Sequence, residues 1–403
     1  MRRQIAAAGA TLTAAGLMLG LGGSPVHAAT PQPAQAAAAL RYLYSRVGAD
    51  GSVAGALGAT EDTVISAADN GYDPATLVGP TGTSAYEYLS SHAGTITTAG
   101  GAAKFVLAWI AAGKPAAIDG AAMLEKLNSR RKGGLLHNDA FHNPDPNVEI
   151  ANAYSQSLAV LADLAAGEKL PPNATGWLRC AQRADGGFGY AIDDSLAKPP
   201  VACGDTSSDT NDTAIVLQAL GNPQVAGTPG VMHAIAQAQG YLHAAQQAAG
   251  GFGFIPPPGG ASDPDSDAVV IQALVAIGED PTGAAWTKGG NAMTDMETFA
   301  DPQGSGGFIF PGSASPDAFT TVSIPQALAL KPYAAKTNFV AGSAPPTGPA
   351  RTPASTQTAG APPVPATGAD PGGELGGLAA VVVAVGALLL VVGIARGRAP
   401  SGR

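Results

Sequence analysis

A short acidic run holds the residues best suited to acid–base chemistry in this chain. Asp209 and Asp212 stand within Asp-Thr-Asn-Asp-Thr-Ala, directly before an apolar stretch of helical length. Two carboxyl groups held close together can divide the roles of proton donor and proton acceptor. The same residue types also start helices, because Asp, Asn and Thr side chains accept hydrogen bonds from free N–H groups. The run is therefore a candidate acid pair or a helix cap, and the cap is the simpler interpretation.

Two other groups contain side chains that can bind metals. Asp263, Asp265 and Asp267 alternate before another apolar run, but an EF-hand would need Gly and Glu where Ala268 and Leu274 stand. His137 and His142 lie in a polar connection together with Asp139 and Asp145, and imidazole with carboxylate is a usual metal-ligand set. Helix capping and a polar surface loop explain the two groups more simply, so we expect no cofactor.

Composition limits the partners of the chain. Its 403 residues include 21 Lys+Arg against 30 Asp+Glu, a net charge of −9, without a long basic block. Binding to nucleic acid through a phosphate-neutralising surface is therefore not expected. The two cysteines are too few for a disulfide-rich scaffold or a four-thiolate zinc site. In an exported domain we expect Cys180 and Cys203 to pair, which would stabilise the insertion between them by ~3 kcal/mol.

Both ends of the chain carry targeting signals. Arg2 and Arg3 precede an uncharged apolar stretch that ends in small residues at Ala28, the pattern of a signal peptide over 1–28. Residues 375–395 carry no charge and are long enough to form a transmembrane helix. A basic tail, 396–403, follows this span and should stay inside. The body is therefore expected on the extracellular face of the plasma membrane.

Residues 341–374 form a stalk rich in Pro, Ala, Thr and Gly that is expected to be disordered. Within it a pentapeptide resembles the LPxTG sorting signal of sortase substrates, with Val in place of Leu; its residues are Val364, Pro365, Ala366, Thr367 and Gly368. Pentapeptide, apolar span and basic tail follow in the order of the complete signal. The resemblance implies covalent attachment to the cell wall, and the alternative is a Pro-rich stalk before a permanent membrane anchor.

The body, residues 29–340, contains an internal repeat. Gln-Ala-Leu recurs at Gln218, Gln272 and Gln326, each time inside an apolar run of helical length. A Gly-Gly-Phe turn precedes each run, and weaker copies extend the pattern back to about residue 40. The repeat unit is therefore helix, glycine turn, helix, and six such units fit in the body.

Six helical hairpins that each expose an apolar face can bury it by closing into a ring. We predict an all-α domain, an α/α toroid, with the more apolar second helices inside and the first helices outside. The starts of the inner helices should then converge at one mouth and form a polar ligand site there. Its predicted residues are Asp62, Glu149, Asp209, Asp212, Asp265, Asp267 and Asp317.

Two segments carry a family resemblance. "GWLRCAQRADGGF" (176–188) and "GYLHAAQQAAGGF" (240–252) resemble the QW repeat of squalene cyclases, with Phe188 and Phe252 where that family usually has Trp. The resemblance implies that Gln182 and Gln246 lie at the ends of outer helices and hydrogen-bond to neighbouring backbone. It also implies the toroid shared by terpene cyclases and protein prenyltransferases.

The resemblance argues against the chemistry of both enzyme classes. The run 209–214 is similar to the DxDDTA motif of class II terpene cyclases, but Asn211 stands where the family has its proton-donating carboxyl, and an amide lacks an ionisable proton of suitable pKa for a general acid. The zinc ligands of prenyltransferases find no match. We therefore expect a non-catalytic module that binds an unknown small molecule or surface partner. The alternatives are a terpene-cyclase-like enzyme and a glycan-active toroid, in which two of the mouth carboxylates would act together.

Overall fold

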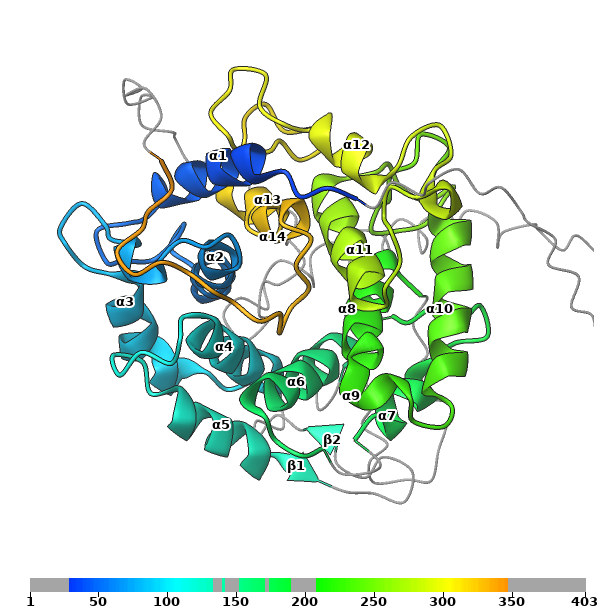
Figure 1. The fold of residues 1–403 in the computed structure, drawn as a ribbon, viewed down its shortest axis with the longest axis horizontal. Coiled ribbons are helices and arrows are strands. Elements are labelled where there is room, and N and C mark those ends of the chain that lie inside the picture. Colours follow the sequence, from blue (N-terminus) through cyan, green and yellow to red (C-terminus); the bar gives the residue numbers. More distant parts are fainter. Residues whose placement is uncertain (1–28, 133–139, 142–151, 171–173, 190–207, 347–403) are drawn as a thin grey trace, which may run out of the picture.

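The computed structural model describes residues 29–132, 140–141, 152–170, 174–189 and 208–346. Within these ranges the chain is an α/α toroid, as predicted, with an inner ring of helices surrounded by an outer ring (Figure 1). The inner helices are α2 (Leu57–Asp69), α4 (Ala99–Ala111), α6 (Ala153–Ala166), α8 (Thr210–Gly221), α11 (Pro264–Ala276) and the short pair α13 (Ala318–Thr321) and α14 (Ile324–Leu328). The outer helices are α1 (Pro33–Tyr44), α3 (Ala85–His92), α5 (Gly120–Ser129), α7 (Gly176–Ala181), α10 (Val231–Ala245) and α12 (Ala292–Glu297).

Each inner helix packs against the next, and α14 packs against α2, so the inner ring is closed. The outer helix α1 contacts both α14 and α2 and therefore covers the junction between the last unit and the first. Every residue of α8 is buried, as expected for a helix surrounded on all sides. A closed ring buries the apolar face of every unit. In an open array of the same hairpins, the two end units would leave apolar surface exposed.

The remaining elements are short. They are η1 (Pro74–Thr76), η2 (Ala93–Thr95), α9 (Pro223–Ala226), η4 (Ala284–Trp286) and the antiparallel pair β1 (Arg131–Lys132) and β2 (Ala140–Phe141). The β-pair was not predicted. It is joined to the inner ring by Gln156, whose side chain accepts a hydrogen bond from the Phe141 N–H at 2.9 Å and donates one to its carbonyl oxygen at 2.5 Å.

The glycine turns have the conformation that the sequence indicates. Gly186, Gly250 and Gly306 have φ values of 87°, 101° and 90°. A Cβ at any of them would lie within 2.4 Å of the backbone of the neighbouring outer segment. Positive φ and close backbone approach both require glycine here, so the need for glycine in these turns is confirmed.

The glutamines of the QW-like segments act as the resemblance implies. Gln182 follows α7, and its Nε2 donates to the carbonyls of Gly186 and Ala234, both at 2.8 Å. Gln246 follows α10, and its Nε2 donates to Gly250 at 2.9 Å and to the carbonyl of Trp286 at 2.7 Å. Each glutamine thereby joins its own glycine turn to the following unit, a structural role.

Several predicted features lie outside the described residues. They are the signal peptide 1–28, the stalk from residue 347 on with Val364 to Gly368, the span 375–395 and the tail 396–403. Among the helices that the structure does describe, none combines the length and apolar character needed to cross a membrane.

Candidate functional site

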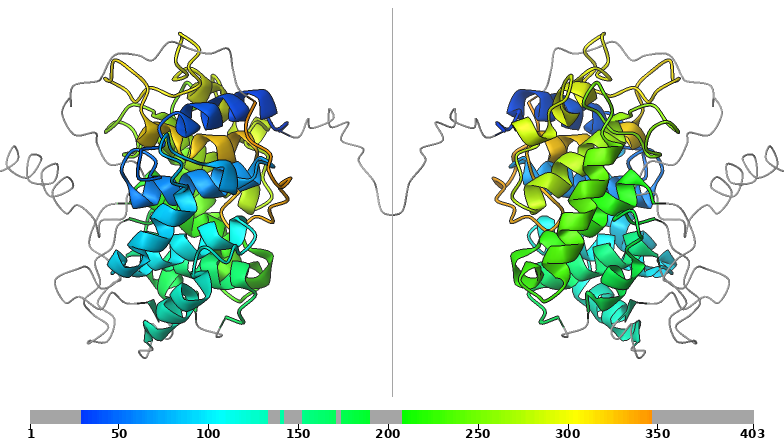
Figure 2. Two further views of the ribbon diagram at one scale, coloured as in Figure 1. Left: turned by 90° about the vertical axis from the view of Figure 1, so that its left-hand side faces the viewer. Right: turned by 90° about the vertical axis from the view of Figure 1, so that its right-hand side faces the viewer.

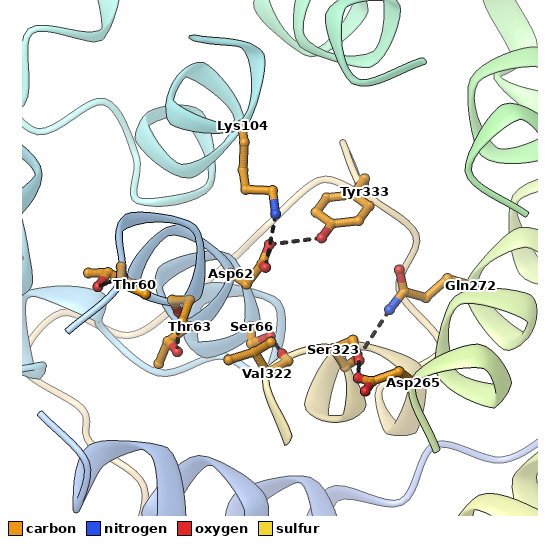
Figure 3. Close-up of polar contacts among 12 residues, drawn as sticks. Thr60, Asp62, Thr63, Ser66, Lys104, Asp265, Gln272, Val322, Ser323 and Tyr333 are labelled. Atoms are coloured by element: carbon orange, nitrogen blue, oxygen red, sulfur yellow. Dashed lines mark hydrogen bonds and ion pairs between the residues drawn. The ribbon is translucent and has the colours of Figure 1, made fainter. Parts of the chain in front are cut away.

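A polar cluster lies at the centre of the inner ring (Figure 3). Lys104 on α4 places its Nζ 3.0 Å from Asp62 Oδ2 on α2, and the Tyr333 hydroxyl donates to Asp62 Oδ1 at 2.8 Å. Asp62 and Lys104 are each 2% exposed and Tyr333 is 8% exposed. Both carboxylate oxygens of Asp62 are therefore occupied by other side chains of this chain, away from solvent.

The repeat explains why these side chains meet. Asp62, Lys104 and Ser323 stand six residues after the N-cap residues of their inner helices, which are Ala56, Thr98 and Asp317. Equivalent positions on neighbouring helices of a ring face the same axis. Two neighbouring inner helices, α2 and α4, therefore direct Asp62 and Lys104 towards one another, and Ser323, between α13 and α14, contacts Asp265 instead.

The charges of the cluster support one another. Burial alone would lower the pKa of Lys104, but the negative charge of Asp62, with Tyr154 and Glu61 adding to it, outweighs burial and holds that pKa above its usual value. Burial and the Asp62 charge raise the pKa of the Tyr333 hydroxyl well above its usual range. Lys104 is therefore a buried cation, and Tyr333 is a neutral hydrogen-bond donor at any physiological pH.

A second group adjoins the first. Ser323 Oγ donates to Asp265 Oδ1 at 3.0 Å, and Gln272 Nε2 donates to the Ser323 carbonyl at 3.1 Å. Burial, followed by the charge of Asp263, raises the pKa of Asp265 well above its usual value, and Asp62 also contributes. Asp265 is therefore a buried carboxyl group with a raised pKa, close enough to Asp62 for the charge of Asp62 to contribute to that shift.

The glutamines of the Gln-Ala-Leu repeats connect successive inner helices. Gln218 on α8 approaches Gln272 on α11 at 3.4 Å between Nε2 and Oε1, and Gln272 reaches α14 through Ser323. Gln326 on α14 donates to Asp69 Oδ2 on α2 at 2.9 Å. The repeated glutamine thus joins α8, α11, α14 and α2 across the place where the ring closes.

The other predicted mouth residues have mixed positions. Asp209 and Asp317 cap α8 and α13, with Oδ1 accepting from the N–H groups of Asp212 and Thr320 at 2.7 and 2.8 Å. Asp212 itself lies in the first turn of α8, so the cap of this helix is Asp209. Asp267 turns away from the ring axis: its Oδ1 accepts from the Phe252 N–H at 2.7 Å, and Asp295 of outer helix α12 lies beside it.

Asn211, at the position of the cyclase acid, is buried, and its Oδ1 has no hydrogen-bond partner. The weak metal candidates His137 and His142 lie outside the described residues, as does Glu149. Within the described ranges no group of three or more His, Cys, Asp or Glu side chains could hold a metal ion. Cys180 on α7 is not a free thiol, but Cys203 lies outside the described residues, so their pairing stays a prediction.

Sequence reasoning missed two members of the central cluster. Lys104 is the single charged residue of the otherwise apolar helix α4, and such a lysine is seldom buried without a partner. The sequence could therefore have indicated this site: Lys104 is a lone lysine in an apolar helix, and it stands at the same distance from its N-cap residue as Asp62 does. Tyr333 follows α14 and belongs to no repeat, so periodicity gives no indication of its place.

No known family model matches this chain, and no curated protein matches it in sequence. Its fold is nevertheless found among solved structures. The unsaturated glucuronyl hydrolase of Bacillus sp. GL1, described as responsible for the degradation of glycosaminoglycan, matches with a TM-score of 0.52 and 14% identity, over 73% of this chain and 94% of that one. The type II terpene cyclase MstE from Scytonema matches with a TM-score of 0.47 and 14% identity, over 74% and 96% of the two chains. At 14% identity the match to the hydrolase shows a shared α/α toroid fold.

Proposed function

We propose that this chain is a non-catalytic binding module, displayed on the outer face of the cell by its C-terminal segment. The observation that carries the proposal is the state of Asp62. A catalytic carboxyl group must be free to exchange a proton with its substrate, but Asp62 is held in an ion pair with the buried Lys104 and also accepts the Tyr333 hydroxyl. The amide at Asn211 further argues against a cyclase acid at the start of α8.

A glycan-active enzyme is the second candidate, because one observation favours it. Burial raises the pKa of Asp265 beside the ion pair of Asp62 and Lys104, and a carboxyl group of raised pKa with a second carboxylate is the usual equipment for glycosidic bond cleavage. The toroid of a glycosaminoglycan-degrading hydrolase resembles this one. In the described structure the Tyr333 hydroxyl and Lys104 both bind the second carboxylate, Asp62.

The test incubates the purified chain with an unsaturated glucuronyl oligosaccharide and, separately, with a linear polyprenoid. The binding-module proposal predicts no product from either substrate, and in a screen of polar ligands it predicts a compound that raises the melting temperature. Asp265→Asn is the diagnostic variant. Turnover by the parent chain that Asp265→Asn abolishes at unchanged melting temperature would overturn the proposal in favour of the glycan enzyme.

The surface location rests on residues 341–403 and has its own test. If sortase acts at the pentapeptide, wall-bound protein should lack everything after its Thr367, and mass spectrometry of wall digests should find the chain ending there. Recovery of the intact chain in the membrane fraction, with none on the wall, would instead indicate a single-pass membrane anchor.

A further inference from the structure

The segment after α14, residues 330–343 and hereafter the strap, crosses one face of the toroid from α14 to α2 (Figures 1 and 2). It is bound along its length by several hydrogen bonds, among them those of Gly342 and Ser343 with Asp73. The Tyr333 N–H donates to Gln218 Oε1 at 2.9 Å, Thr337 Oγ1 donates to the Ala111 carbonyl at 2.9 Å, and the Val340 N–H donates to the Gly71 carbonyl at 3.1 Å. The strap therefore covers the end of the ring at which α2 and α4 finish.

The ring does not need the strap in order to close. The packing of α14 on α2, the covering helix α1 and the hydrogen bond from Gln326 to Asp69 all join the last unit to the first. All of these contacts are made by residues that come before residue 330 in the chain. Removal of the strap would therefore leave the closed ring of helices in place.

Backbone strain is concentrated on both sides of Tyr333. Leu330 has a φ of 54° and Ala334 a φ of 63°, a left-handed conformation that costs energy for residues with a Cβ. Strained residues of this kind persist where surrounding contacts hold them, and they are frequent in clamps and switch segments. Both are held by local turns on either side of Tyr333: the N–H groups of Leu330 and Lys331 donate to the carbonyls of Ala327 and Gln326 at the end of α14, at 2.9 and 3.0 Å, and the Ala335 N–H donates to the Pro332 carbonyl at 3.2 Å.

We propose that the strap is a displaceable lid and that Tyr333 keeps the central site of the toroid occupied until a ligand takes its place. The ligand class is a small ring compound that carries a hydroxyl group, because the site holds the Tyr333 ring and accepts its hydroxyl at Asp62. This inference rests on the proposed function, since it names the site and the control of a binding module. Opening of this lid requires no helix of the ring to unfold.

Opening is tested on the full chain by hydrogen exchange. The amides of Tyr333 and Val340 should exchange at least about 10-fold faster than those in the middle of α8, because strap opening precedes global unfolding. Tyr72 and Val340 pair across a parallel β-bridge, a spacing that a disulfide can span. In the variant with Tyr72→Cys and Val340→Cys, oxidation should slow exchange at Tyr333 to the rate of α8, and reduction should restore it. Exchange at equal rates in the strap and in α8 of the parent chain would overturn the inference.

Ligand class is tested with phenol and Tyr333→Ala, which removes the natural occupant. Phenol should raise the melting temperature of this variant by about 2–4 °C at saturating concentration, and benzene, which lacks the hydroxyl group, should raise it less. Equal effects of phenol and benzene would refute recognition at Asp62. If Tyr333→Ala does not fold, Tyr333→Phe serves instead: loss of one hydrogen bond should accelerate strap exchange by about 5- to 10-fold, and an unchanged rate would refute the lid.

These results separate the two proposals. A strap that opens only with the whole ring overturns the lid and leaves a binding module that uses another surface. Turnover in the substrate test overturns the binding module whatever the exchange rates are.

Discussion

Asp69, at the end of α2, offers the sharpest prediction about pH. Its Oδ2 accepts from Gln326 Nε2 at 2.9 Å, while its Oδ1 is buried without a partner. Beside it lies a cavity of about 10 Å³ lined also by Leu107, Ile110 and Ala334, little more than the room for one water molecule. Burial raises the pKa of this carboxyl from 3.8 to about 7, against the opposing hydrogen bond from Gln326 and the charge of Lys331.

The raised pKa of Asp69 determines whether stability rises or falls with pH. A group whose pKa is raised by folding contributes stability that is fully present below its unfolded pKa and is lost as pH rises through its folded pKa. For Asp69 the loss therefore falls between about pH 4 and pH 7. The pKa difference corresponds to about 4 kcal/mol at 1.36 kcal/mol per pKa unit, and partial contact of the residue with solvent reduces this to about 2–4 kcal/mol.

Asp69→Asn removes the ionisation and keeps the shape of the side chain. Its amide oxygen can still accept from Gln326 Nε2. Its amide N–H group lies near Gln326 Oε1, which in the parent chain is buried without a partner. We expect the variant to match the parent within about 1 kcal/mol near pH 5 and to exceed it by about 2–4 kcal/mol near pH 8. Urea unfolding followed by circular dichroism at both pH values measures the difference.

Asp119→Asn is the matched control. Asp119 is an exposed N-cap of α5, with Oδ1 accepting from the Ala122 N–H at 3.1 Å, and Asn caps a helix equally well. This control should change the free energy of unfolding by the same small amount at both pH values. A gain from Asp69→Asn that is equal at pH 5 and pH 8, or a loss at pH 8, would refute the buried ionisation.

Three further predictions concern the framework. Gly250→Ala should destabilise by more than about 3 kcal/mol, because its Cβ would lie 2.1 Å from the backbone of Gly290, whereas Gly227→Ala, with open space and a negative φ, should have little effect on the melting temperature. Asp209→Ala should cost ~0.5–2 kcal/mol and Asp209→Asn much less; an equal loss in both would contradict the role of Asp209 as a cap. Mass measurement without reductant should find the chain two hydrogens lighter than its reduced form, and two free thiols would exclude the predicted bridge of Cys180.

The ring architecture was predictable because the same sequence pattern recurs in successive repeat units. Gly186, Gly250 and Gly306 recur with a glutamine or an aromatic residue at fixed offsets, and each copy reports the same local geometry. The Gln-Ala-Leu repeat marked the inner helices, although the hydrogen bonds of Gln218 with Gln272 across them were not foreseen.

The centre of the ring was less predictable, because it depends on differences between the repeats. Asp62 was identified as a mouth residue, but its contacts with Lys104 and Tyr333 join two units and a segment outside the repeat. Asp267 was grouped with it by sequence position, yet a cap at Asp263 turns the side chain of Asp267 outward, towards Phe252. The position of a carboxylate relative to the N-cap residue of its helix, and not its closeness to other carboxylates in the sequence, decides whether it faces the ring axis.

The central claim is that Asp62 serves as the partner of a buried lysine and not as a catalytic acid. A double-mutant cycle of Asp62→Asn and Lys104→Met tests it most directly, with the free energy of unfolding as the measurement. Asp62→Asn removes the ion-pair partner of the buried Lys104 and should cost about 3–5 kcal/mol, whereas the double variant should recover most of that loss because the buried lysine charge is then also removed. Replacement of a catalytic residue more often preserves or increases stability. An Asp62→Asn chain as stable as its parent, with additive effects in the double variant, would contradict the account.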